Sequence, residues 1–587
     1  MTLALSGQVV EPGIAIGQAH NIQRNEIEIG EYRIEREQVE AEVERLLHAA
    51  GEARDHLEAL AERLAKAAGA PGHEIIHTHI AMLDDSSLVQ ASARHIREQL
   101  CNAEWALQLQ LESLVGEFRA IDDAYIRSRE EDVVQVVRMV QRVLAEEPTD
   151  RPLDEVPDRL GQTLVVATEL TPNELAILHD RGVAGVITEH GSPYSHTAIL
   201  ARGMGIPIVM GVRRAQALIT EGEQLVLDGA YGIVFADPEE SILRHYLQKQ
   251  SESDRYRRLL KRTRSAPARS LDGEAIALLA NAERPDDIRR AKKDGAEGVG
   301  LFRSEYLFLQ GEPPDEDAQL EHFRQALEAL DGAPLTIRTL DAGADKPVRG
   351  LVLDDLHSPA NPALGLRAVR LCLRQMDFFK IQLRAILRAA ALGPVNCMIP
   401  MLTTDREVLA VRSLLDETRL DLEREGIAHG GRDMQVGGMI EVPAAALALE
   451  RMGRHLDFIS VGTNDLIQYA LAADRVDESV AHLYDPLHPG VLYLLRHIFT
   501  TARRLQLPVA VCGEMAGDRR FTRLLLALGL REFSMQPRSL LEVKKVITET
   551  NIGAVRAALE DWESETGGRQ AGHASLASFL DQAQLRH

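Results

Sequence analysis

Cysteine is scarce in this 587-residue sequence. Its four cysteines are Cys101, Cys372, Cys397 and Cys512. They are too few and too widely spaced for a disulfide framework or for a zinc site built on C-x-x-C pairs. Any cysteine with a special role must therefore act alone.

Basic charge is also in short supply. Lysine and arginine total 66 against 89 aspartates and glutamates, which gives a net charge of −23. A strongly negative chain repels nucleic acid and anionic lipid, so we expect neither as a partner. A basic protein or an anion bridged by a metal ion fits this charge better.

Long hydrophobic runs are missing as well. No apolar run approaches the roughly 20 residues that a membrane-spanning helix requires, so we expect no membrane insertion. The first 17 residues lack the basic region and apolar stretch of a secretory signal. We therefore expect a cytoplasmic protein.

The composition is that of a globular protein, with 45% hydrophobic and 26% charged residues. The chain is too long for one hydrophobic core, so we expect about three domains. After short strands at 7–10 and 14–19, residues 34–145 read as long amphipathic helices. Apolar residues recur there at spacings of three and four, most clearly at 36–67 and 98–118.

Three prolines in residues 147–158 end this helical part and indicate a connector. A small α/β domain then ends near Asp237. Thr171 and Glu174 form a capping-box sequence that predicts a helix at 173–180. The predicted strands are 163–167, 183–188, 207–211, 225–228 and 233–236, and a charged helix at 239–264 leads to a break at 265–270.

The second half of the sequence alternates short apolar runs with helical patterns. The eight runs are 275–281, 298–303, 335–341, 396–401, 436–442, 458–463, 509–514 and 532–535. Eight such alternations predict a (β/α)₈ barrel, a fold whose active sites lie at the carboxyl ends of the strands. Those ends carry Asn281, Arg303, Arg338 with Asp341, Met401, Glu441, Asn464 with Asp465, Cys512 with Glu514, and Ser534.

Two arginines stand out at these ends. The guanidinium groups of Arg303 and Arg338 match phosphate or carboxylate oxygens with paired hydrogen bonds, so together they would form an anion clamp. Taken alone, either arginine is equally well explained by a structural ion pair with Asp341 or Glu305.

Two carboxylates and a thiol complete the predicted constellation. Glu441 and Asp465 are hard oxygen donors of the kind that Mg²⁺ prefers, although each alone could be a buried carboxylate satisfied by hydrogen bonds. Cys512 ends an apolar strand, where a cysteine is usually a small core residue. Its place at the barrel mouth favours a role in proton transfer.

His196 is the candidate nucleophile. A turn rich in glycine, serine and proline precedes it, and an apolar helix at 198–202 follows. This places the imidazole near a helix N-terminus, where backbone N–H groups favour a negative phosphoryl group. A capping or surface histidine explains the motif equally well.

Six segments together resemble enzyme I of the bacterial phosphotransferase system, the phosphoenolpyruvate-protein phosphotransferase family. They occur in the family order and span nearly the whole chain. The segments are 170–174 (LTPNE), 195–202 (SHTAILAR), 300–305 (GLFRSE), 341–346 (DAGADK), 462–469 (GTNDLIQY) and 512–517 (CGEMAG).

The resemblance implies a role for each matching residue. His196 is expected to be phosphorylated on Nε2 and Cys512 to donate a proton, while Mg²⁺ is expected on Glu441 and Asp465. Phosphoenolpyruvate (PEP) is expected to bind Arg303, Arg338, Asn464, Asp465 and Arg475. Pyruvate is the expected product.

The resemblance also implies the domain arrangement and partners. An α/β phosphohistidine domain is expected at residues 1–21 and 146–237, with a helical domain inserted at 22–145 that binds the carrier protein HPr. A linker at 238–270 and the barrel at 271–587 follow. The barrel is expected to form a homodimer, and acidic stretches such as 26–31 and 37–44 suit a basic partner.

The sequence departs from the commoner family pattern at Pro193-Tyr194, Ala344 and Ile467. These departures bear on loop detail and partner preference. One alternative is a pyruvate or PEP dikinase or synthase, but no nucleotide-binding domain or Gly-rich phosphate loop precedes His196. A non-catalytic PEP sensor is a second alternative, and the intact nucleophile, carboxylate pair and thiol argue against it.

Overall fold

The computed structural model describes residues 2–22, 30–66, 79–83, 86–120, 124–145, 160–191, 196–308, 313–343, 361–431, 433–475 and 480–566. The chain forms two compact units, Met1–Arg255 and Tyr256–His587. The predicted connector and the departures at Pro193-Tyr194 and Ala344 lie outside the described residues. None of the described helices is both long enough and apolar enough to cross a membrane.

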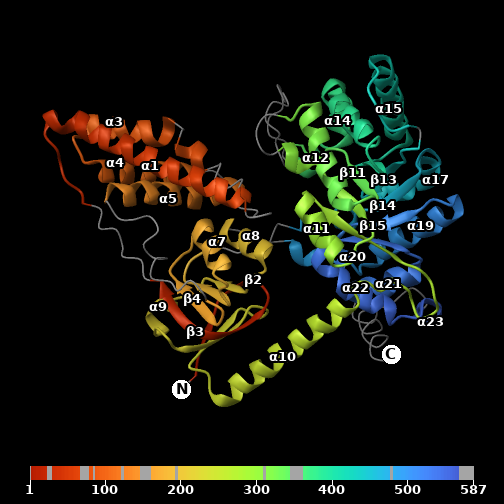
Figure 1. The fold of residues 1–587 in the computed structure, drawn as a ribbon, viewed down its shortest axis with the longest axis horizontal. Coiled ribbons are helices and arrows are strands. Elements are labelled where there is room, and N and C mark those ends of the chain that lie inside the picture. The colour runs from red at the N-terminus through yellow and green to blue at the C-terminus, as the bar shows by residue number, and fades with distance from the viewer. Residues whose placement is uncertain are drawn as a thin grey trace. The chain divides into compact units, whose positions relative to one another are not determined.

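Four longer helices make up most of the described residues in the helical part of the first unit. They lie side by side in Figure 1 and are α1 (Val39–Lys66), α3 (Ala91–Gln99), α4 (Ala103–Ala120) and α5 (Ala124–Leu144). Residues at helical spacing on α1, including Leu46 and Leu57, are almost fully buried. These apolar faces explain why the amphipathic pattern predicted helices here.

The periodic stretch at 98–118 is not one continuous helix. Helix α3 ends at Gln99, Leu100 takes a left-handed conformation with φ of 52°, and α4 begins at Ala103. The carboxylate of Glu42 accepts the Ala103 N–H at 2.7 Å. A side chain of α1 therefore satisfies a backbone group that a continuous helix would pair internally.

The α/β part of the first unit contains an eight-stranded mixed sheet in the order β1-β8-β7-β3-β4-β5-β6-β2. Strands β3 to β6 pair in parallel, and the remaining pairs are antiparallel. The bounds are β1 (Leu3–Ser6), β2 (Gln8–Glu11), β3 (Ile14–Ile22), β4 (Thr163–Ala167), β5 (Gly185–Thr188), β6 (Ile208–Met210), β7 (Gln224–Asp228) and β8 (Ile233–Ala236). The sequence pattern did not predict β1, which is short and half exposed.

Both faces of this sheet are covered. Val165 and Ala167 join a core that continues into the helical part, whereas Leu164 and Val166 join a second core on the opposite face. This split follows from the two-residue period of a strand. The flanking helices are α7 (Pro172–Asp180), α8 (His196–Met204) and α9 (Ala215–Leu218).

Two local predictions in this unit are confirmed. Helix α7 begins with the capping box, in which Glu174 accepts the Thr171 N–H at 2.8 Å and Thr171 Oγ1 accepts the Glu174 N–H at 3.3 Å. Helix α10 (Glu240–Arg262) occupies the predicted charged helix. Its Lys249 binds the fully buried carboxylate of Asp228 at 3.1 Å, which anchors α10 to the sheet.

The second unit is a closed barrel of eight parallel strands, as the sequence predicts. All eight predicted runs contain a strand, and most strands end one to three residues earlier than predicted. The strands are β9 (Ala277–Ala282), β10 (Val299–Arg303), β11 (Leu335–Arg338), β12 (Val395–Ile399), β13 (Val436–Ile440), β14 (Phe458–Val461), β15 (Val509–Val511) and β16 (Glu532–Met535).

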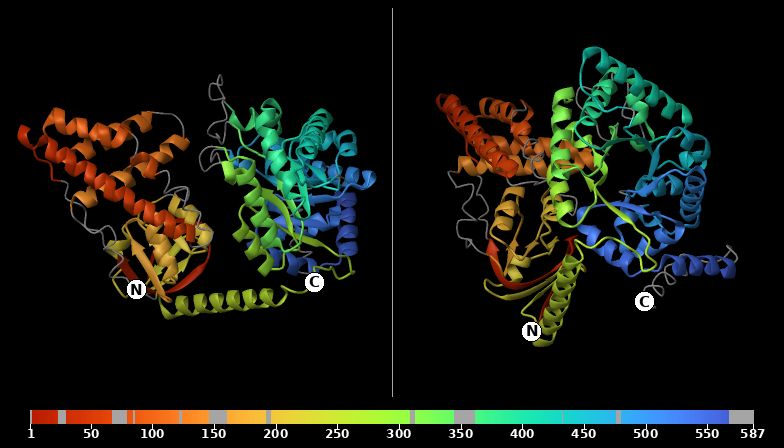
Figure 2. Two further views of the ribbon diagram at one scale, coloured as in Figure 1. Left: turned by 45° about the horizontal axis from the view of Figure 1, so that its top comes forward. Right: turned by 45° about the vertical axis from the view of Figure 1, so that its right-hand side comes forward.

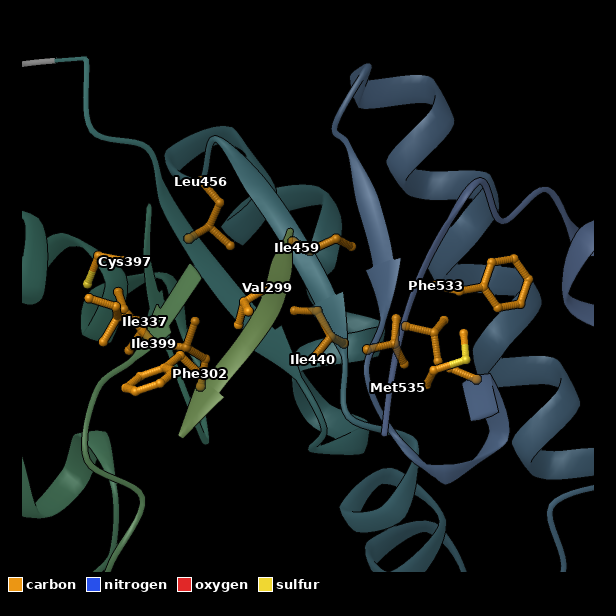
Figure 3. Packing of buried hydrophobic residues seen from close by; sticks show 14 of the residues in the cluster. Val299, Phe302, Ile337, Cys397, Ile399, Ile440, Leu456, Ile459, Phe533 and Met535 are labelled. Atoms are coloured by element: carbon orange, nitrogen blue, oxygen red, sulfur yellow. The ribbon is translucent and has the colours of Figure 1, made fainter. Parts of the chain in front are cut away.

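Helices surround the barrel strands (Figures 1 and 2). The longer ones are α11 (Pro285–Lys293), α12 (Glu316–Leu330), α14 (Met376–Ala389), α15 (Asp405–Glu425), α19 (Pro489–Leu505), α21 (Arg519–Leu528), α22 (Leu540–Thr548) and α23 (Ile552–Thr566). Alternate strand residues such as Ile337, Cys397 and Phe533 pack in the core that these helices cover (Figure 3). The intervening residues face the barrel interior, where the polar side chains of the strand ends converge.

Candidate functional site

Strand alternation gives the barrel a small apolar interior with polar groups around it. Leu301, Met398, Met439 and Cys512 form a separate apolar cluster inside the barrel. Arg338 contacts this cluster through Met439, whose sulfur lies 4.0 Å from Nη1. The charged side chains at the strand ends therefore surround an apolar cluster made of sulfur-containing side chains and a leucine.

Arg338 is the most deeply held of the predicted ligands. Its Nη2 lies 3.1 Å from Glu305 Oε1, and its Nη1 lies 3.0 Å from Asp341 Oδ2. Burial works against the charged guanidinium, but the two carboxylates outweigh it and raise the pKa of Arg338 above its ordinary value. Arg338 thus stays cationic while making the ion pairs that the sequence left open as an alternative.

Arg367 joins this group, although the sequence argument did not find it. Its Nη2 lies 2.8 Å from Asp341 Oδ1 and 3.8 Å from Asp465 Oδ2. No strand ends at Arg367, so a rule based on strand ends passes over it. Its only local signal is an arginine in an apolar stretch, and Arg367 is indeed 6% exposed.

Arg303 occupies a more open position at the end of β10. Its Nη1 binds Glu283 Oε1 at 3.0 Å, and about a third of its side chain, 33%, is exposed. Glu283 follows β9 directly and is a second residue that the sequence argument missed. Among the described residues, Arg303 thus forms an ion pair with one carboxylate, whereas Arg338 forms ion pairs with two.

Glu441 and Asp465 lie close enough for their charges to interact. Burial chiefly, and then the charges of Asp341 and Asp465, raise the pKa of Glu441, and Arg338 opposes that shift only in part. The Glu441 carboxylate accepts the N–H of Met401 at 2.6 Å. A Cβ at Gly462 would lie 2.8 Å from Glu441 Oε2, so a larger residue there would displace the Glu441 carboxylate.

This pair has the chemistry of a cation site. Two carboxylates held together in a buried place repel each other, and a divalent cation would remove that repulsion. In the described parts of the chain, no three His, Cys, Asp or Glu side chains are grouped so as to hold a metal ion. A cation on Glu441 and Asp465 would need further oxygen ligands from water or a bound phosphate.

Cys512 lies beyond β15 among these charges. Burial is the main cause that raises the pKa of Cys512 to about 11, with Glu441 adding to the shift and Arg338 and Arg303 opposing it. The thiol is therefore protonated at neutral pH. The Asn281 amide donates to the Cys512 carbonyl at 2.9 Å, and Ser534 donates to Asn281 Oδ1 at 2.6 Å.

Asn464 and Arg475 form the outer edge of the site with Glu514. Asn464 and Asp465 lie in the first turn of α18 (Thr463–Leu471). Asn464 Nδ2 donates to Glu514 Oε1 at 3.1 Å, and the Glu514 N–H donates to Asn464 Oδ1 at 2.8 Å. Arg475 Nη1 lies 3.9 Å from the same Glu514 carboxylate.

Buried polar atoms at the mouth lack partners. Within the described ranges, Nε of Arg338 and Oγ1 of Thr463 are buried without a hydrogen bond. Buried polar atoms are usually paired, so water or a bound polar group would be needed to satisfy these two. Thr463 also packs on Gly513, where an added Cβ would lie 1.9 Å from its hydroxyl oxygen.

His196 belongs to the first unit, where it is the first residue of α8. The following residue, Thr197, is buried and donates from Oγ1 to the carbonyl oxygen of Leu170 at 2.9 Å. This bond ties the first turn of α8 to the loop before α7. The structure therefore groups seven of the eight predicted site residues at the barrel mouth, and it places His196 in the other unit.

Family models match three consecutive parts of the chain. The N-terminal region of PEP-utilising enzymes matches residues 6–129, their mobile domain residues 161–232, and their PEP-binding domain residues 257–552. Together with the barrel and its charged mouth, these matches define the class as that of the PEP-utilising enzymes.

Similar proteins narrow this class. The phosphoenolpyruvate-protein phosphotransferase of Cupriavidus necator is 44% identical over 557 residues, covering 93% of this chain and 94% of that protein. The protein of the same name from Geobacillus stearothermophilus is 36% identical over 552 residues, which cover 93% of each chain. A solution structure of an Enzyme I protein is 27% identical, covering 43% of this chain and 99% of that chain, with a TM-score of 0.37.

The chain therefore belongs to the phosphoenolpyruvate-protein phosphotransferase family. This confirms the resemblance inferred from the six sequence segments and the expectation that the protein is an enzyme of this kind.

Proposed function

We propose that this enzyme transfers the phosphoryl group of PEP to Nε2 of His196 and then to an HPr-type carrier protein, releasing pyruvate. This would be the first step of sugar uptake by the phosphotransferase system. One observation carries the proposal: Arg338 and the thiol of Cys512 meet at one apolar cluster inside the barrel, and the charges of Arg303 and Glu441 also act on that thiol. Four strands thus bring an anion clamp, a carboxylate and a proton donor to one place.

The arginines would hold the substrate. PEP carries a phosphate and a carboxylate, and guanidinium groups bind both with paired hydrogen bonds. Arg303, Arg338 and Arg475, with the amide of Asn464, would surround these anions. Transfer of a phosphoryl group depends mainly on positioning and charge neutralisation, which such a clamp supplies.

PEP-utilising enzymes work with a divalent metal, and we propose Mg²⁺ here. Glu441 and Asp465 would hold it, because carboxylate oxygens are the ligands that Mg²⁺ prefers. When bound, the ion would neutralise charge on the phosphoryl oxygens. The mutual repulsion of the carboxylates near Glu441 supports this assignment.

The chemical step would use two residues of the chain. The neutral imidazole of His196 attacks phosphorus in line, a nitrogen–phosphorus bond forms, and the bond to the enol oxygen breaks. The enolate that remains takes a proton on its methylene carbon from the Cys512 thiol, which gives pyruvate. The thiolate then recovers a proton from water.

The domain boundaries remain part of this proposal. We assign the carrier-binding role to residues 22–145, and the exposed Glu37 and Glu44 on and before α1 support it, because acidic surfaces steer a basic partner. We also propose a homodimer through the barrel unit, on which Leu447 and Tyr493 are 58% and 64% exposed. Sedimentation at several protein concentrations would test for the dimer.

The first experiment is transfer of label from ³²P-labelled PEP in the presence of Mg²⁺, with and without ATP. We expect a label on His196 that is stable in base and labile in acid, that forms without ATP, and that HPr then removes. His196→Ala should take up no label, whereas His179→Ala, which changes a surface histidine of the same unit, should behave like the parent protein. Labelling that requires ATP would favour a dikinase, and no labelling would favour a sensor.

A further inference from the structure

His322 is a titratable group that the mechanism above does not use. It is half-buried on α12, with its ring centroid 5.5 Å from that of Phe302 and 6.4 Å from that of Tyr306. Burial is the main cause that lowers the pKa of His322, and the charge of Arg284 adds to it. The ring is therefore neutral at neutral pH, and only one of its nitrogens carries a hydrogen.

The hydrogen-bond partner of His322 shows which nitrogen that is. Nε2 lies 3.2 Å from the carbonyl oxygen of Glu283. A carbonyl oxygen only accepts hydrogen bonds, so Nε2 is the donor and carries the proton. Two aromatic rings hold the imidazole from the sides, and its proton points at the loop that follows β9.

Glu283 is fixed through its backbone on both sides. Its carbonyl accepts from His322, and its own N–H donates to Asp287 Oδ2 at 3.3 Å. Asp287 also accepts the N–H of Arg284 at 3.1 Å and so belongs to the start of α11. The carboxylate of Glu283 then projects from a loop whose peptide groups are anchored to α11 and α12.

That carboxylate binds Nη1 of Arg303 at 3.0 Å. A guanidinium has five N–H donors, so one contact leaves others for the oxygens of an anion. Arg303 and Glu283 are 33% and 45% exposed, and an ion pair this open contributes little to stability. The contact is better explained by its effect on orientation, because it fixes the direction in which the Arg303 guanidinium points.

We infer that Glu283 and His322 act together as positioning residues for Arg303, holding its guanidinium ready for an anionic substrate. The inference rests on the proposed function, because it assumes that Arg303 contacts PEP. Arg338 needs no such support, because it forms ion pairs with the buried carboxylates of Glu305 and Asp341. Arg303 lies at the rim of the barrel and, among the described residues, lacks such buried ion pairs. It is held instead by Glu283, whose backbone carbonyl is bound by His322.

PEP binding by the full chain tests the inference. The background is His196→Ala, in which PEP and Mg²⁺ bind without turnover, and the dissociation constant of PEP is measured by calorimetry. Glu283→Ala should weaken binding about ten-fold, the effect of losing one oriented contact, and Glu283→Gln should lose less because its amide oxygen still accepts from Nη1. The matched control is Glu425→Ala, since Glu425 is similarly exposed, at 47%, and pairs with Arg384 on the outside of the barrel at 2.6 Å.

The second arm changes His322. His322→Leu should weaken PEP binding in the same direction as Glu283→Ala, and His322→Gln should restore much of it because its side-chain amide can donate to the Glu283 carbonyl. If the two residues act through one path, the double variant His322→Leu with Glu283→Ala should bind no more weakly than Glu283→Ala alone. Fully additive losses would show that His322 acts elsewhere and would overturn the pairing.

Arg303→Ala separates this inference from the proposed function. If Arg303→Ala abolishes binding while Glu283→Ala binds like the parent, the positioning role is wrong and the proposed function stands. A tighter complex with Glu283→Ala would also overturn it, because the carboxylate would then compete with PEP for Arg303. If Arg303→Ala itself binds PEP normally, the assignment of the substrate site fails instead.

Discussion

The arginines at the barrel mouth form two contrasting pairs. The side chains of Arg338 and Arg367 are 10% and 7% exposed and are bound by carboxylates that are themselves buried. Those of Arg303 and Arg475 are 33% and 38% exposed and touch the more exposed carboxylates of Glu283 and Glu514. The comparison separates guanidinium groups that are buried and paired with buried carboxylates from guanidinium groups that stay partly solvated.

The inner pair explains how positive charge can persist inside a barrel. A buried charge is costly unless it is paired, and Asp341 forms ion pairs with both Arg338 and Arg367. The two arginines, Asp341 and Glu305 therefore form one network. Arg303 and Arg475 are partly solvated, so their charge costs little folding free energy. Their surroundings therefore need only orient the two guanidinium groups.

The largest expected effect comes from breaking the inner network. Arg338→Met should lower the free energy of unfolding of the barrel unit by about 3–5 kcal/mol, because it leaves the buried Glu305 without its counter-charge and Asp341 with Arg367 alone. It should also abolish labelling by PEP. Urea unfolding followed by the fluorescence of Trp562, which lies on α23 in this unit, measures the stability once Trp105 of the first unit is replaced by Phe.

Arg303→Met is the control for this experiment. Removing an exposed partner should change the same unfolding free energy by less than about 1 kcal/mol while still impairing labelling. Equal losses of stability in the two variants would contradict the distinction between inner and outer arginines.

Cys512→Ala should have the next largest effect, and this effect should fall on the rate of turnover and not on substrate binding. Removing a general acid commonly lowers a rate by about 10²–10⁴-fold, so pyruvate release should fall by at least about a hundred-fold while PEP affinity changes little. Because burial raises the pKa of Cys512 to about 11, the thiol stays protonated well above pH 9. The rate of pyruvate release should therefore not decline through the ordinary thiol range near pH 8.5.

Unchanged turnover in Cys512→Ala would remove the assignment, and a decline with an apparent pKa near 8.5 would contradict the buried thiol. Cys101→Ala is a suitable control, because it replaces another buried thiol that lies in the helical part of the first unit.

Arg475→Ala tests whether Arg475 behaves like the other exposed arginine, Arg303. We expect PEP affinity to fall about ten-fold, the loss of one charge-assisted contact, with a change in unfolding free energy within about 0.5 kcal/mol. Parallel calorimetry and urea unfolding would measure both quantities. A large loss of stability would place Arg475 with the inner arginines.

The stability of the barrel unit should also depend on pH through Glu441. Burial and neighbouring carboxylates raise the pKa of Glu441 in the folded state, so its ionisation costs stability as pH rises from the unfolded value through the folded value. Without metal, Glu441→Gln should therefore be more stable than the parent at pH 9, by on the order of 1 kcal/mol for each unit of raised pKa, and equal to it at pH 4.

Added Mg²⁺ should stabilise the parent more at pH 9 than at pH 6, since only the ionised carboxylate binds the ion. The variant should lose this dependence. Thermal unfolding at the two pH values measures both effects, and identical curves for parent and variant would argue against a strained carboxylate at 441.

The barrel could be predicted from the sequence because its signal is repeated and local. Each strand is a short apolar run bounded by helical patterns, and closure follows from having eight of them. The strand ends also predicted most of the mouth, since alternation fixes which residues face inward. Arg338 and Cys512 were found in this way, whereas Arg475 was found only through the family resemblance.

The features that the sequence did not predict depend on contacts between distant segments. Arg367 enters the site from a loop. The role of Glu283 can be inferred only from its contacts with Arg303 and His322. The break at Leu100 likewise depends on Glu42 of another helix. None of these contacts leaves a periodic pattern, so only the folded structure reveals them.

The position of Met401 bears on how this site tolerates mutation. Met401 has a left-handed backbone with φ of 56°, and its N–H holds the Glu441 carboxylate. Every residue except proline offers that N–H, so the contact does not depend on the identity of the side chain. The bond to Glu441 thus survives a change of side chain at 401, and proline alone would remove it. The Met401 side chain itself is buried in the barrel core, so a smaller residue there would cost packing rather than the bond.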